Sequence, residues 1–192
     1  RLSNGLQLLV VEKRAVPMIA FSLVLNAGAT TDPVALPGLA AFTADMLEEG
    51  TSSRSSMQIA GEFDFIGSHL TSSAGREHTT VGTATLTREF PKALELVADL
   101  VQNPTFPEDE LARLGNERRT AVRRLRDNPS AIANQLTPGL LFGRQSAYGH
   151  PLDGGENLYE AVRRDDMMGH FQTNFGPQNA TLAVVGDISL EE

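Results

Sequence analysis

Apolar and polar residues alternate along the first part of the chain. Every second residue is apolar within 6–10 and again within 19–25. Such period-two alternation is typical of a strand with one buried face, because successive side chains point to opposite sides of a sheet. A third alternating stretch, rich in Thr and Val, surrounds a turn near Gly75 and predicts a hairpin over 68–86.

Other stretches carry apolar residues at three-and-four spacing, the pattern of a helix with one buried face. They cover 39–47, 55–66, 90–101, 107–125, 130–141 and 161–174. Pro138 and Gly139 lie inside the fifth stretch and predict a kink or an early end there. The short apolar run 181–185 then predicts a buried strand.

Capping signals support three of these helices. Ser55 and Gln58 have the spacing of a capping box. Pro107 suits the first position of the fourth helix, where the acidic residues 108–110 would face the positive end of the helix dipole. Ser130 is the expected cap of the fifth helix.

The order of these elements predicts the fold class. Strands are joined partly by tight turns and partly by helix pairs, which favours an α+β fold with a mainly antiparallel sheet covered by helices. No long linker and no repeat of roughly 20–50 residues interrupts the pattern. We therefore expect a single domain over residues 1–192.

Composition narrows the classes of partner. The chain has a formal net charge of -8, which argues against a nucleic-acid partner because phosphate binding needs clustered cations. It contains no cysteine, which excludes disulfides and thiolate metal sites. No apolar run reaches the roughly 18 residues of a membrane span. The chain opens on Arg1 without a signal sequence, so we expect a piece of a longer precursor.

The second half of the fourth helix is basic. Its five arginines are Arg118, Arg119, Arg123, Arg124 and Arg126. Acidic residues precede them on the same helix, which indicates a solvated face with pairs three or four residues apart. Contact with an acidic partner subunit or peptide is the alternative interpretation.

The four histidines are scattered along the chain. His69, His78, His150 and His170 show neither the four-residue spacing nor the H-x-H spacing of a zinc site. Structural roles are therefore expected. A metal site made by His69 and His78 across the predicted hairpin is the alternative, although two ligands alone rarely hold a metal.

The chain contains a set of short motifs that are spread over nearly its whole length. They are Leu2-Ser3-Asn4-Gly5-Leu6, Asn26-Ala27-Gly28, Leu36-Pro37-Gly38-Leu39-Ala40, Met46-Leu47-Glu48-Glu49-Gly50-Thr51, Glu77-His78-Thr79, Asn103-Pro104-Thr105-Phe106-Pro107, Glu117-Arg118, Tyr148-Gly149-His150-Pro151, and Asn179-Ala180-Thr181-Leu182 before Val185-Gly186-Asp187. With these motifs the chain resembles the insulinase/pitrilysin zinc peptidases, which include the mitochondrial processing peptidase. The resemblance implies the fold of the metallopeptidase domain of that family.

Active members of that family carry an H-x-x-E-H motif on their first long helix, with two histidines for zinc and a glutamate as the base. Through the flanking motifs, the matching positions here are Ala41, Ala44 and Asp45. The third ligand is a glutamate seven residues after the glutamate of the Glu-Arg pair. Glu117 matches that pair, and counting on reaches Arg124, or Arg123 if the register is shifted by one.

These replacements lead us to expect neither a bound metal nor another cofactor. A dication opposed by an arginine is repelled, since two unit charges 4 Å apart interact by roughly 4 kcal/mol at an effective dielectric constant of 20. Two roles are open for Asp45: an ion pair with Arg124 or Arg123, or a carboxylate exposed to solvent. From the matching positions we expect Asp45 to lie within salt-bridge distance of Arg123 or Arg124.

In active relatives a strand at the sheet edge binds the substrate as an added strand. The matching segment here is Ser68, His69, Leu70, Thr71, Ser72 and Ser73. Main-chain hydrogen bonding requires no particular side chains, so peptide binding could outlast the loss of catalysis.

The resemblance implies a non-catalytic domain, the N-terminal half of a two-domain subunit. Such a domain would pair with an active zinc-peptidase domain or subunit and enclose a peptide substrate. Two alternatives stay open: an active zinc metallopeptidase with an atypical site, and a structural scaffold subunit. Bacterial relatives are often exported, which favours a periplasmic or secreted location.

Overall fold

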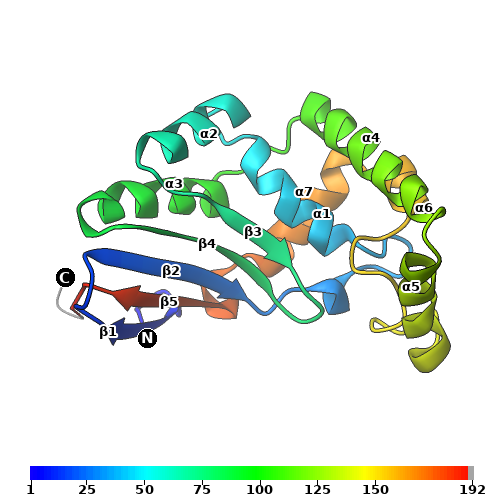
Figure 1. Ribbon diagram of the computed structural model, residues 1–192, viewed down its shortest axis with the longest axis horizontal. Coiled ribbons are helices and arrows are strands. Elements are labelled where there is room, and N and C mark those ends of the chain that lie inside the picture. The colour runs from blue at the N-terminus through cyan, green and yellow to red at the C-terminus, as the bar shows by residue number, and fades with distance from the viewer. Residues whose placement is uncertain (190–192) are drawn as a thin grey trace.

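The computed structural model describes residues 1–189, and its centre is a mixed sheet (Figure 1). Within these residues the sheet has five strands in the order β1-β5-β2-β4-β3. The strands are β1 (Gln7–Glu12), β2 (Met18–Leu25), β3 (Thr71–Ala74), β4 (Thr79–Leu86) and β5 (Ala180–Gly186). Only β1 and β5 run parallel, and the other pairings are antiparallel. The predicted α+β class with a mainly antiparallel sheet is confirmed.

Period-two alternation decides which face of the sheet is buried. Ile19 and Phe21 on β2 are 2% and 1% exposed, and Phe21 lies opposite the buried Val184 of β5. Their neighbour Ala20 is exposed and lies opposite Val185, which is also exposed. The core therefore forms on one face of the sheet, and the helices lie against that face (Figure 1).

The helices follow the predicted ranges with one exception. They are α1 (Leu39–Met46), α2 (Ser56–Phe65), α3 (Phe90–Gln102), α4 (Glu108–Leu125), α5 (Pro129–Phe142), α6 (Glu156–Ala161) and α7 (Arg164–Asn174). The helix predicted over 161–174 corresponds to α7, whereas α6, which ends at Ala161, was not predicted from the sequence. The backbone of Val162 is extended, with φ -61° and ψ 137°, and this residue separates the two helices.

The observed helix caps match the caps predicted from the sequence only in part. The capping box of Ser55 and Gln58 is present at the start of α2. Pro107 precedes the first turn of α4 and does not occupy its first position. The cap of α5 is Asn128, whose side chain accepts hydrogen bonds from the N–H groups of Ser130 and the next residue, so the prediction of Ser130 as the cap was wrong.

Helix α5 continues past its internal proline. Pro138 lacks an N–H, yet the helix extends to Phe142, so the early end was not found. The helix has no buried residue along its length. It stands at the end of the molecule opposite both termini (Figure 1).

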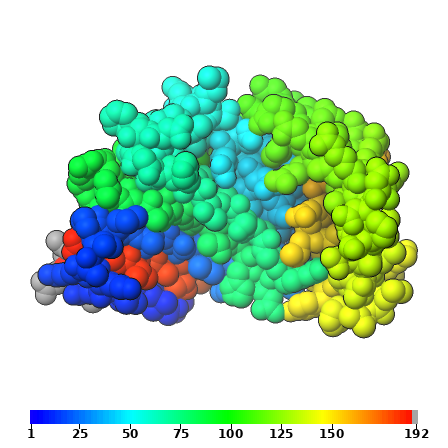
Figure 2. Space-filling model, viewed as in Figure 1, coloured from blue at the N-terminus to red at the C-terminus, as the bar shows by residue number. Residues whose placement is uncertain are grey.

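Helix α1 joins the sheet to the outer helices. It contacts β3 on one side and α7 on another. The ring of Phe42 on α1 meets Tyr159 on α6 edge to face, with ring centroids 5.0 Å apart. Figure 2 shows a hollow between the hairpin tip and the α4–α5 arm, where a pocket of about 390 Å³ is lined by residues including Arg76 and Arg118.

Over residues 1–189, none of the helices combines the length and the apolar composition that crossing a bilayer requires.

Candidate functional site

The N-terminus of α1 is fixed by a carboxylate outside the helix. The N–H groups of Gly38 and Ala40 donate to the two carboxylate oxygens of Asp32 at 2.6 and 2.7 Å. Gly38 has φ 98°, and a Cβ there would lie 2.5 Å from the backbone nitrogen of Gly154. Asp32 and this close backbone approach together set the position of the helix that carries Ala41, Ala44 and Asp45.

Two of the three positions on α1 that the resemblance matches to the motif carry methyl groups. Ala44 is fully buried and Ala41 is half-buried. Neither side chain has a lone pair, so neither can bind a metal or accept a proton. The carbonyl oxygen of Ala44 accepts a hydrogen bond from the hydroxyl of Ser72 at 2.7 Å, which ties α1 to β3.

The third position forms an ion pair. Nη2 of Arg118 on α4 lies 2.6 Å from Oδ2 of Asp45. The Asp45 side chain is 24% exposed and that of Arg118 is 42% exposed. Burial raises the pKa of Asp45 to about 6, and the nearby Arg118 guanidinium opposes that rise.

The predicted partners of Asp45 were wrong. Arg123 pairs instead with Glu156, at 2.8 Å between Nε and Oε2. Arg124 is exposed and forms no ion pair with any residue in 1–189. Helix geometry gives the reason, because six residues turn a side chain by about 600°, so Arg124 points well away from the direction of Arg118.

The carboxylate of Glu117, next to Arg118 in the sequence, forms an ion pair within α4. Its Oε1 lies 3.0 Å from Nη1 of Arg113. Arg113 also holds Glu49 at 2.7 Å and Glu110 at 2.6 Å, so its guanidinium bridges three carboxylates. The charged side chain that α4 places next to Asp45 is therefore the Arg118 guanidinium and not the Glu117 carboxylate.

These residues do not fit a zinc ion. Zinc sites in proteins use three or four nitrogen, sulfur or oxygen ligands at close to 2 Å. Ala41 and Ala44 provide none, and Asp45 is already bound to Arg118. Residues 1–189 contain no cluster of three or more His, Cys, Asp or Glu side chains able to hold a metal.

The histidines lie in separate parts of the fold. His69 precedes β3 and His78 precedes β4, so the hairpin register, which pairs Thr71 with Gly82, places them toward opposite ends. The alternative of a metal site between these two is not supported. His170 is buried, which lowers its pKa, and its Nε2 lies 3.4 Å from the hydroxyl of Thr31.

A second acidic group near the end of α1 was missed in the sequence. Burial, followed by the charges of Glu49 and Asp45, raises the pKa of Glu48 to about 7. The spacing of three residues between Asp45 and Glu48 could have shown that they share a helix face. Desolvated carboxylates therefore gather where α1 meets the short turn Leu47–Glu49.

The predicted substrate segment lies at the sheet edge in part. Of its six residues, Thr71, Ser72 and Ser73 belong to β3, which pairs with β4 and has no strand on its other side within residues 1–189. Ser68 precedes the strand and is 2% exposed. The carbonyl of His69 accepts a hydrogen bond from the hydroxyl of Thr83 at 2.8 Å, so His69 is tied to β4. Leu70 packs against the core.

Comparison with known proteins decides the family. The family model described as "Insulinase (Peptidase family M16)" matches residues 8–140, more than half of the chain. The chain belongs to the insulinase family. The resemblance seen in the sequence is confirmed.

Full-length insulinase relatives are similar along the whole chain. An uncharacterized zinc protease of Rickettsia bellii is 29% identical over 192 residues, which is 100% of this chain and 46% of that protein. The β subunit of the bovine mitochondrial processing peptidase is 25% identical over 193 residues, covering 100% of this chain and 39% of that protein. The chain therefore spans less than half the length of these relatives.

A solved insulinase-family structure has nearly the same fold. The peptidase M16 inactive domain from Pseudomonas fluorescens superposes with a TM-score of 0.93 at 28% identity, over 98% of this chain and 46% of that chain. That neighbour is described as an inactive domain.

Proposed function

We propose that this chain is a non-catalytic insulinase-family domain, the N-terminal half of a two-domain subunit. It pairs with an active zinc-peptidase domain or subunit and helps to enclose and bind a peptide. The relatives that it matches are more than twice as long, which supports a second half of comparable size.

One observation carries the proposal: the ion pair between Asp45 and Arg118 in the place of a metal site. Hydrolysis by the family mechanism requires a metal that lowers the pKa of water and a base that accepts its proton. The guanidinium beside Asp45 repels a dication, and the methyl group of Ala44 accepts no proton. The Pseudomonas fluorescens domain, described as inactive, supports the same conclusion.

The proposed peptide-binding site is the edge strand β3. The free side of this strand can receive an extended peptide through main-chain hydrogen bonds, which do not depend on the lost catalytic side chains. The hydroxyl of Ser72 anchors the strand to α1 beside the altered motif. Bound peptide would then lie along Thr71, Ser72 and Ser73.

Zinc content and cleavage test the loss of catalysis. The purified chain should contain far less than one zinc per molecule by plasma mass spectrometry and should not cleave an unfolded peptide. A homologue with an intact H-x-x-E-H motif, prepared in the same way, is the control. Stoichiometric zinc together with chelator-sensitive cleavage would overturn the proposal and favour an atypical active peptidase.

Hydrogen exchange tests peptide binding within the assembled complex. When an unfolded peptide is added, amides of β3 should become protected while those of β1, the other edge strand, remain unchanged. A stable complex with an active partner in which β3 shows no protection would contradict the peptide-binding role and favour a scaffold.

A further inference from the structure

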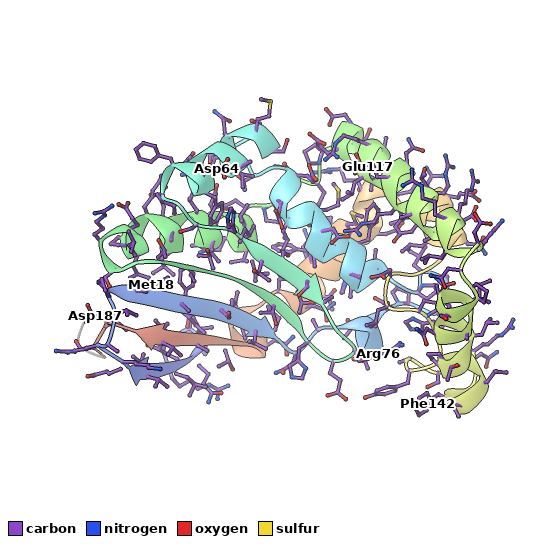
Figure 3. All side chains as sticks on the ribbon, in the orientation of Figure 1. Met18, Asp64, Arg76, Glu117, Phe142 and Asp187 are labelled. Carbon is purple, nitrogen blue, oxygen red and sulfur yellow. The ribbon has the colours of Figure 1, made fainter. Side chains whose placement is uncertain are left out.

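Hydrogen bonds join the tip of the β3–β4 hairpin to the loop that follows α5. Nη1 of Arg76 donates to the carbonyl oxygens of His150 and Ala147, at 2.6 and 3.3 Å. The hydroxyl of Tyr148 donates to the carboxylate of Glu77. Figure 3 shows Arg76 at the end of the hairpin, on the side of the molecule that carries α5. We call these three hydrogen bonds the tip latch.

The hairpin side of the tip latch is fixed to the body of the domain. The N–H groups of Ala29 and Thr30 donate to the carbonyl oxygens of Gly75 and Arg76, at 3.0 and 2.9 Å. A Cβ at Gly28 would lie 2.6 Å from both carbonyl oxygens, so the two backbone segments touch. Behind the tip, β4 pairs with β2 in the middle of the sheet. The tip is therefore a fixed point.

The loop side of the tip latch is fixed to α5. A Cβ at Gly149 would lie 1.8 Å from the carbonyl oxygen of Gly143, so the loop folds back closely onto the end of the helix. The ring of Tyr148 contacts the ring of Phe142, with centroids 5.9 Å apart. Helix and loop therefore form one unit, the α5 arm, which comprises residues 129–150.

The α5 arm is not packed into the core. None of the residues of α5 is buried. A pocket of about 390 Å³ lies between the helix and the hairpin tip, and its lining includes Ala131, Asn134, Gln135 and Pro138 of α5 and Arg76 of the tip. A segment with few buried contacts opens at a low cost in free energy, because opening exposes little apolar surface.

Short connections join the α5 arm to the body at both ends. Residues 126–128 link α4 to α5. At the other end, Gly154 is fixed, because a Cβ there would lie 2.6 Å from the carbonyl oxygen of Pro37. Residues 151–153 are thus the second connection. Hinges in proteins are commonly a few loop residues of this kind between rigid units.

The pocket under the arm adjoins the edge strand β3. This strand ends at Ala74, two residues before Arg76, which lines the pocket. A peptide added along the free side of β3 would therefore reach the pocket at the hairpin end of the strand. The hollow between the hairpin tip and the arm is visible in Figure 2.

We infer that the α5 arm is a gate beside the peptide-binding edge and that the tip latch holds this gate closed. With the latch formed, the arm is one wall of the pocket at the end of β3. When the latch breaks, the arm swings about its two connections and the pocket opens. The inference rests on the proposed function, since the gate acts on the peptide that β3 would bind.

A distance measurement on the chain alone tests the latch. The chain has no cysteine, so two introduced cysteines can be spin-labelled selectively. Asp64→Cys on α2 and Leu140→Cys on the arm are exposed positions far from each other (Figures 1 and 3). Double electron–electron resonance should give one main distance with the latch intact. R76A/Y148F, which removes all three hydrogen bonds, should make a longer distance the major population.

Matched variants control this measurement. E77Q keeps an acceptor for the Tyr148 hydroxyl and should keep the single main distance. R88A removes an exposed arginine just beyond the other end of β4 and should also keep it. Circular dichroism checks that each variant folds. Y148F alone, which deletes one hydroxyl, replaces the double variant if that does not fold, and should raise the longer population by about fivefold.

Peptide kinetics test the gate. The chain is assembled with the H-x-x-E-H-bearing insulinase-family protein of the same genome, and binding of a fluorescein-labelled unfolded peptide is followed by stopped flow. R76A/Y148F should raise the association and dissociation rate constants together, by about fivefold or more, because an open gate speeds both entry and exit. The dissociation constant should change by less than about twofold.

The outcomes separate the gate from the proposed function. A single unchanged distance in R76A/Y148F and Y148F would overturn the gate and leave the proposed function standing. A longer distance with unchanged peptide rates, in a complex that binds peptide, would also overturn the gate alone. If no complex forms, or if the complex binds no peptide, the proposed function fails and the gate fails with it.

Discussion

The spacing of apolar residues on α4 indicates which way the side chain of Arg118 points. Apolar spacing on α4 runs through Leu111, Leu114, Arg118, Val122 and Leu125, so the only cation in that stripe had to face inward. A count from the family motif instead reached Arg124, which is exposed. Helix periodicity was the better guide because it follows the three-dimensional direction of each side chain.

Removing Arg118 should destabilise the fold in a pH-dependent way. Arg118→Ala leaves the Asp45 carboxylate half-buried without its cation, a loss of about 1–2 kcal/mol at pH 8. The pKa of Asp45 is raised from 3.8 to about 6, so the carboxyl lowers stability as the pH rises from 3.8 to about 6, and at pH 5 it is mostly protonated in the folded protein and interacts little with Arg118. Urea denaturation should therefore show a smaller loss at pH 5.

Arg119→Ala is the matched control for this substitution. Nη1 of Arg119 lies 4.0 Å from Glu160 on the surface, and its removal should change stability by less than about 0.5 kcal/mol. Equal losses for Arg118→Ala at pH 5 and pH 8 would contradict the role assigned to Asp45.

At the scale of elements, α1 depends on a residue that precedes it. Asp32 receives the N–H groups of Gly38 and Ala40 in place of an ordinary cap, and burial raises its pKa although these bonds lower it. The helix begins on a glycine with no capping side chain of its own. Correct placement of the Ala41-to-Asp45 turn thus depends on the loop before it.

Asp32→Ala should destabilise the fold by about 1–3 kcal/mol, because two buried N–H groups lose their acceptor. Thermal or urea unfolding measures the loss. Asp64→Ala, at an exposed position on α2, is the control and should change stability by less than about 0.5 kcal/mol. Equal effects of both substitutions would show that the Asp32 contacts contribute nothing to stability.

Helix α5 shows where local patterns mislead. Its leucine spacing suggests a core helix, yet its apolar side is exposed and its small and amide side chains line the pocket beside α4. Periodicity identifies a face that favours burial, but it does not say which molecule covers that face.

At the scale of the molecule, the core and the arm have different roles. Leu158 of α6 is 2% exposed and belongs to the core, whereas Leu140 is 83% exposed. Leu158→Ala should cost about 2–4 kcal/mol through lost burial and a cavity, and Leu140→Ala less than about 0.5 kcal/mol. Urea denaturation of the isolated chain measures both, and a comparable loss at Leu140 would mean that α5 is buried in solution.

The sequence by itself determined the α+β class, the approximate ranges of the helices other than α6, the hairpin and the absence of the H-x-x-E-H side chains. These follow from local periodicity and from residue identity. Tertiary structure alone decided that Arg118 faces Asp45 and that the apolar side of α5 is exposed. Contacts between segments far apart in the chain depend on how elements pack, and local patterns do not encode that packing.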